Sequence, residues 1–233
     1  MSAPRQLPMP TTFRFQTIFP TDWNVADLQH RLGGIPLNRI CLIPPPGCAV
    51  EEDVIRLYDQ EHRLCELQEG ILVEKTMGWY ESLLAGLIIT RINVYLETHN
   101  LGKVLGPDGT LRLLPGLVKI PDVCFVSWQR WPEPAPPRRP IPTIVPDLVI
   151  EVLSESNTAD EMQDKLQVYQ QAGVPMIWYI DPQARDAVCY LGVGKSIHIE
   201  CDGVLAGGAI LPNFELSLCE LFARADAQRP TDL

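Results

Sequence analysis

The chain has 233 residues, 46% of them hydrophobic, with a formal net charge of −10 and a pI of about 4.8. This acidity argues against a protein that binds nucleic acid or membrane by charge alone, although a local cationic groove remains compatible with it. No apolar run reaches the roughly 20 residues of a membrane span, and no signal-peptide pattern opens the sequence. Seven scattered cysteines without a CxxC pair indicate reduced thiols, so we expect a cytoplasmic protein.

The first part of the chain predicts an extension rather than a core. Residues 1–20 are rich in proline and lack periodicity, which is typical of a loose arm. The stretch from Trp23 to Leu32 predicts a short helix, and three prolines at 44–46 predict an extended connector. We therefore expect an N-terminal arm and short helix over 1–43, the main domain over 44–226 and a C-terminal tail over 227–233.

A hairpin and a long helix should open the main domain. Arg63–Leu67 and Ile71–Lys75 alternate as paired strands around a turn with Gly70. From about Gly78 to Thr98, apolar residues recur at helical spacing. Glu81 shares the apolar face of this helix. A carboxylate in the first turn is already favoured by the helix dipole, which explains Glu81 without a catalytic role.

The most unusual stretch follows Pro146 and Asp147. Leu148–Ser154 is a short apolar, β-branched run that Glu151 interrupts. Such a run is typical of a strand covered on both faces. A glutamate in its middle is costly unless a metal, a cation or a hydrogen-bond network compensates for the lost solvation.

The next helix carries a matching lysine. Thr158 and Glu161 predict a capping box, so the helix should begin near Ala159 and end before Gly173. Lys165 lies near the middle of its apolar face and should point toward Glu151. A buried structural ion pair and an active site account equally well for these two residues. A strand from Met176 to Asp181, a hairpin and a final helix over 215–224 complete a mixed α/β domain with a central sheet flanked by helices.

Two aspartates compete for a place beside Glu151. Asp147 lies on the same strand about 13 Å away, which is too far to share a metal. Asp122 begins a separate strand, and if that strand is the neighbour of the one with Glu151, the separation falls to about 4.8 Å. Asp122 and Glu151, with Glu81 as a third carboxylate through a water, would make an oxygen-only site suited to Mg²⁺ or Mn²⁺. Lys165 would add a cation able to steady a hydroxide or the charge of a phosphorane-like transition state.

This arrangement resembles the PD-(D/E)xK nuclease superfamily, and more closely its branch of putative restriction endonucleases of the Uma type. The resemblance covers roughly residues 44 to 226 and rests on the order and spacing of several short motifs. These motifs are Cys65–Leu67, Gly70–Lys75, Met77–Ser82, Ile120–Val123, Pro146–Ser154, Lys165 with Tyr169, Ala172–Pro175 and Asp181–Pro182.

The resemblance implies a metal-dependent phosphodiesterase core that acts on DNA, in a protein that tends to form homodimers. It implies metal ligation by Asp122, Glu151 and the backbone carbonyl of Val152, with Glu81 as an accessory acid. The superfamily pattern places its lysine two residues after the glutamate, where this chain has Leu153. The resembling branch often supplies the lysine from the next helix, which fits Lys165.

Two hypotheses follow. The first is an endonuclease that uses Mg²⁺ or Mn²⁺ to hydrolyse DNA, in which Lys165 orients or activates water. The second is a nuclease fold without turnover, an interaction protein in which Glu151 and Lys165 form a structural pair. Metal ions should raise the melting temperature in the first case and leave it unchanged in the second.

Overall fold

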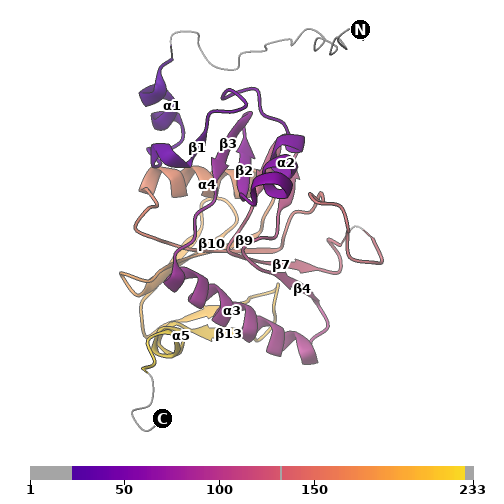
Figure 1. Cartoon of the computed structure of the whole chain (residues 1–233). Helices are drawn as coiled ribbons and strands as arrows, with labels where there is room; N and C mark the ends of the chain where they lie inside the picture. Colours follow the sequence, from indigo (N-terminus) through magenta and orange to yellow (C-terminus); the bar gives the residue numbers. More distant parts are fainter. Residues whose placement is uncertain (1–22, 132, 229–233) are drawn as a thin grey trace, which may run out of the picture.

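The structure is a computed structural model that describes residues 23–131 and 133–228 (Figure 1). The predicted arm over residues 1–20 and most of the predicted tail lie outside these ranges. The helices are α1 (Val25–Arg31), the short 3-10 helix η1 (Leu37–Arg39), α2 (Glu51–Glu61), α3 (Trp79–Thr98), α4 (Ala159–Gln171) and α5 (Leu218–Ala225). Among residues 23–131 and 133–228, none of the helices combines the length and the apolar character that a membrane span requires.

A mixed central sheet runs through the middle of the molecule in the order β11-β10-β9-β8-β7-β4. Only β8 and β9 pair in parallel, and α4 connects them, while the other neighbours are antiparallel. This confirms the predicted α/β fold, a mixed sheet flanked by helices. Its strands are β4 (Gly102–Leu105), β7 (Val123–Ser127), β8 (Leu148–Val152), β9 (Met176–Asp181), β10 (Asp186–Leu191) and β11 (Ser196–Ile199).

Both faces of the central sheet are covered, as the short apolar, β-branched run of β8 predicts. Leu148, Ile150 and Val152 belong to a core that includes α3 and α5. Val149 belongs to a second core that includes residues of α4. Figure 1 shows α3 and α5 on one side of the central strands and α4 on the other.

A second sheet, which the sequence analysis did not predict, lies on the α4 side (Figure 1). Its order is β1-β3-β2-β6-β5, and its strands are β1 (Ile40–Cys41), β2 (Cys65–Gln68), β3 (Ile71–Glu74), β5 (Leu111–Leu114) and β6 (Leu117–Lys119). The predicted hairpin is confirmed as β2 and β3. Part of the expected N-terminal extension also joins this sheet, because β1 pairs with β3. The division at residues 43 and 44 stays a prediction.

The C-terminal helix begins later than predicted. Glu215–Ser217 form strand β13, which pairs with β12 (Val204–Ala206), and α5 begins only at Leu218. The hydroxyl of Ser217 accepts a hydrogen bond from the Glu220 amide and so caps the helix. The prediction of a helix from residue 215 was wrong because the amphipathic pattern does not reveal pairing with a distant strand.

Candidate active site

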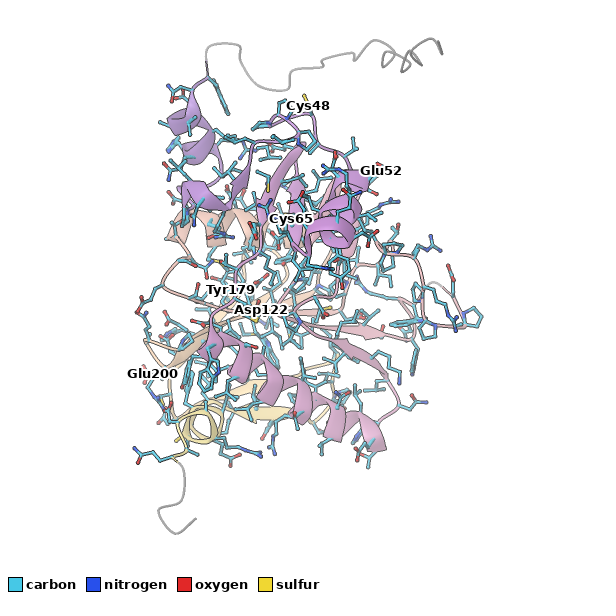
Figure 2. All side chains as sticks on the ribbon, in the orientation of Figure 1. Cys48, Glu52, Cys65, Asp122, Tyr179 and Glu200 are labelled. Carbon is cyan, nitrogen blue, oxygen red and sulfur yellow. The ribbon has the colours of Figure 1, made fainter. Side chains whose placement is uncertain are left out.

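Asp122 and Glu151 lie opposite each other on neighbouring strands. In the antiparallel register of β7 and β8, Val123 faces Ile150, so the residue before Val123 comes beside Glu151. Alternation along each strand turns both carboxylates toward α4. They are only 5% and 4% exposed, and an Asp122 oxygen accepts a hydrogen bond from the Val152 amide at 2.7 Å. Figure 2 labels Asp122 and Tyr179 in the middle of the molecule.

Helix α4 supplies two partners for Glu151, one turn apart. The Lys165 ammonium lies 3.3 Å from Glu151 Oε2, and the Tyr169 hydroxyl donates a hydrogen bond to Oε1 at 2.6 Å. Lys165 therefore points toward Glu151, as its place on the apolar face predicts. The cap of α4 differs in part from the predicted capping box. Thr158 accepts from the Glu161 amide, but the Glu161 carboxylate turns away to Arg39 and Asn157.

The second sheet contributes charges that the sequence analysis missed. Glu66 on β2 lies 3.6 Å from the Lys165 ammonium and 3.0 Å from that of Lys119 on β6. Its carboxylate also accepts a hydrogen bond from the Ile120 amide. Glu66 and Lys119 are each a single charged residue within a short apolar stretch. The same pattern drew attention to Glu151, so it could have identified Glu66 and Lys119 as well.

Lys75, just after β3, completes the cluster. Its ammonium lies 2.8 Å from Asp122 Oδ1 and donates to the Ile120 carbonyl. Three carboxylates thus face three ammonium groups between the two sheets and α4. We call this cluster the buried charge network, and its members are Glu66, Lys75, Lys119, Asp122, Glu151 and Lys165.

Burial and charge act in opposite directions on the pKa values of this network. Burial raises the pKa of Glu151, and the Asp122 and Glu66 carboxylates add to the rise while Lys165 opposes it. Burial also acts to raise the pKa of Glu66, but Lys119, Lys165 and Lys75 outweigh it and leave that pKa well below its usual range. For Lys165, burial favours the neutral amine, yet Glu151, Glu66 and Asp122 raise its pKa above the ordinary value. Lys165 is therefore protonated at neutral pH.

Glu81 and Asp147 occupy different settings. Glu81 lines the same small cavity as Asp122 and Glu151, and its carboxylate lies against Gly78 at the start of α3. It forms no hydrogen bond or ion pair with another residue in the described ranges. Asp147 accepts a hydrogen bond from the Ser127 amide and pairs with Arg130 at 3.0 Å. Asp147 is therefore a strand-end acid with local partners, as its distance from Glu151 predicts.

The cavity beside the network opens toward a groove. The cavity measures about 20 Å³, and its lining includes Asp122, Glu151 and Lys165. A groove of about 750 Å³ adjoins it, between the start of α3 and the loop that follows β8. The two spaces share lining residues, namely Arg39, Thr76, Met77, Glu81 and Ser154. A ligand in the groove would therefore approach the network from this side.

The residues present fit a divalent cation of the magnesium type. Within the described ranges, no group of three or more His, Cys, Asp or Glu side chains gathers as a metal site. Mg²⁺, however, commonly binds through one or two carboxylates together with water and substrate phosphates. Within residues 23–131 and 133–228, each oxygen of Asp122 and Glu151 has one protein donor and keeps a second lone pair. The cavity also exceeds the roughly 10–15 Å³ that one water-sized particle needs.

Comparisons with known proteins agree with this fold. The family model Uma2, described as putative restriction endonuclease, matches residues 51–219. Among solved structures, the chain is similar to a putative nuclease belonging to DUF820 from Anabaena variabilis, with a TM-score of 0.63 and 21% sequence identity over 70% of this chain and 91% of that one. This likeness shows a shared fold. A search of curated proteins returns no match. Because the family model covers well over half of the sequence, the chain belongs to the Uma2 family of putative restriction endonucleases.

Proposed function

We propose that this protein is an endonuclease that uses a divalent metal, Mg²⁺ or Mn²⁺, to hydrolyse phosphodiester bonds in DNA. The observation that carries the proposal is the meeting of Asp122, Glu151 and Lys165 beside a groove, in a chain of this family. Restriction-endonuclease-like enzymes generally use divalent metals. Asp122, Glu151 and the Val152 carbonyl would hold the ion, and Glu81 would contact it through a water.

The roles of the chain's own residues follow from their charge states. A bound divalent ion would polarise the phosphate and lower the pKa of a coordinated water. Lys165, protonated because its pKa is raised, cannot accept a proton and instead donates hydrogen bonds. It orients water and steadies the negative charge that develops on the phosphate. Tyr169 holds the Glu151 carboxylate in place through its hydroxyl.

The second candidate remains a nuclease fold that binds a partner without turnover. The balance of the buried charge network favours it, because three ammonium groups offset three carboxylates and each Asp122 and Glu151 oxygen has a donor. Such a network is complete as a structural device.

A plasmid-cleavage assay with Mg²⁺ or Mn²⁺ tests the leading proposal. Wild-type protein should nick or linearise the plasmid, and Glu151→Gln should lower the rate by about a thousandfold, which corresponds to about 4 kcal/mol in the barrier. Asp147→Asn is the matched control, because it removes a carboxylate directly before the same strand, β8, but outside the buried charge network. Equal cleavage by wild type and Glu151→Gln would overturn the assignment of the site.

Thermal unfolding with and without metal separates the two candidates. A cation held by Asp122 and Glu151 only in the native state should raise the melting temperature of the wild type, but not of Asp122→Asn. If metal leaves the melting temperature of both proteins unchanged while both remain folded, the nuclease fold without turnover is the better description.

The expected homodimer stays a prediction, and sedimentation of the full chain would test it.

A further inference from the structure

Arg39 is a buried arginine with one end of its guanidinium group unused. Arg39 is only 6% exposed, at the end of η1. Its Nη2 lies 2.9 Å from Glu161 Oε1, and its Nε donates to the Glu74 carbonyl at 3.1 Å. Its Nη1 is also buried but has no hydrogen-bond partner within the described ranges. A buried donor without an acceptor costs free energy, so this nitrogen calls for an explanation.

The position of Arg39 suggests a role for its unpaired Nη1. Arg39 lines both the cavity that contains Asp122 and Glu151 and the adjoining groove. It is therefore a cation at the boundary between the candidate catalytic carboxylates and the space open to a ligand. It also precedes residue 51, where the family match begins, so the match to the family assigns it no role.

We infer that Arg39 binds a phosphate group of the nucleic-acid substrate where the groove meets the cavity. This inference rests on the proposed function for the identity of the ligand. Arginine suits this task because its planar guanidinium presents several donors in a fixed fork that matches phosphate oxygens. Glu161 and the Glu74 carbonyl orient the fork from one side, which leaves Nη1 as the donor for the substrate.

A purely structural clamp is the competing explanation, and Arg31 is the matched case. Arg31 also lies in the N-terminal segment and contacts α4, at 4.0 Å from Asp164, and it pairs with Glu69. It lines neither the cavity nor the groove described above. If clamping alone mattered, conservative changes at Arg39 and Arg31 would affect DNA binding to the same degree.

The test uses fluorescence anisotropy in Mg²⁺ to measure how a short fluorescein-labelled deoxyoligonucleotide binds the full-length chain. All variants carry Glu151→Gln, which slows cleavage during the measurement. Arg39→Lys keeps the charge beside Glu161 but loses the fork, and should weaken binding about tenfold. Arg31→Lys should bind like its parent. Glu161→Gln should bind more tightly, because it removes a carboxylate next to Arg39.

A salt titration supplies a readout that clamping would not change. The double variant Arg39→Met/Glu161→Gln removes both charges and so avoids an unpaired buried ion. Relative to Glu161→Gln alone, its slope of log affinity against log salt should fall in magnitude by about one, as expected for one lost phosphate contact. An unchanged slope, equal effects at Arg39 and Arg31, or no binding by the parent would each overturn the inference. Arg39-dependent binding, together with no cleavage by the wild-type chain in any metal, would support the inference and refute the proposed hydrolysis.

Discussion

The two faces of strand β8 differ in what they bury. One face carries Leu148, Ile150 and Val152 into an apolar core with α3 and α5. The other carries Val149 and Glu151 toward α4 and the second sheet, where the buried charge network lies. A buried aliphatic side chain contributes about 1.5–3 kcal/mol, whereas a buried ion costs several kcal/mol before its partners repay it. Burial on the apolar face therefore stabilises the fold and offsets the free-energy cost of burying charges on the other face.

The largest loss of stability is expected when Lys165, which bridges two carboxylates, is removed. Lys165→Met should lower the free energy of unfolding by about 3–5 kcal/mol, because Glu151 and Glu66 both lose a buried partner. Urea unfolding measures the change. Added Mg²⁺ should restore part of the loss if the carboxylates can hold a cation. A loss below about 1 kcal/mol would show that the network does not depend on this residue.

A substitution on the opposite face should affect stability but not chemistry. Ile150→Ala creates a cavity in a fully buried site and should lower the free energy of unfolding by about 3 kcal/mol. Its side chain belongs to the α3 core rather than the network, so cleavage per folded molecule should stay at the wild-type level. A specific loss of turnover in this variant would contradict the division between the two faces.

Loss of the tyrosine hydroxyl next to Glu151 should have a smaller effect on stability and a pH-dependent effect on activity. Tyr169→Phe should lower the free energy of unfolding by about 1–2 kcal/mol. In the wild type, the hydrogen bond from Tyr169 favours the ionised form of Glu151. Without it, the already raised pKa of this carboxyl should rise further. Cleavage, which needs the carboxylate, should then require a higher pH.

Tyr179→Phe is the control for this shift. Tyr179 is buried in the same core, but its hydroxyl donates to the Met162 carbonyl at 2.9 Å rather than to Glu151. It should destabilise by a similar amount without moving the acid limb of the pH–rate profile. Identical profiles for both variants would show that Tyr169 does not tune Glu151.

The smallest expected effect on stability concerns an exposed charge pair between α3 and α5. Arg91 on α3 lies 3.9 Å from Glu220 on α5, and their side chains are 43% and 70% exposed. Arg91→Ala should change the free energy of unfolding by less than about 0.5 kcal/mol, because solvent and salt screen exposed pairs. A larger loss would mean that the α3–α5 contact depends on charge as well as on its apolar core.

The sequence alone determined the central features of the site. Glu151 was visible because a charge within a β-branched apolar run violates the burial rule, and Lys165 because helical spacing placed it on an apolar face. Strand geometry favoured Asp122 over Asp147, and the register of β7 and β8 places Asp122 beside Glu151. The positions of Glu151 and Lys165 could be predicted because they depend on local periodicity, which the order of residues specifies directly. The position of Asp122 depended in addition on the pairing of β7 with β8.

Only the tertiary structure decided which further charges join them. Glu66 and Lys119 come together because β2 pairs with β6, through the register of Leu67 with Val118. Lys75 reaches Asp122 from the end of a hairpin in a different sheet. Pairing between segments some 50 residues apart leaves no periodic signal in either one, since it depends on which strands become neighbours in the folded chain. The sequence therefore predicted Asp122, Glu151 and Lys165, whereas the fold brought in Glu66, Lys75 and Lys119.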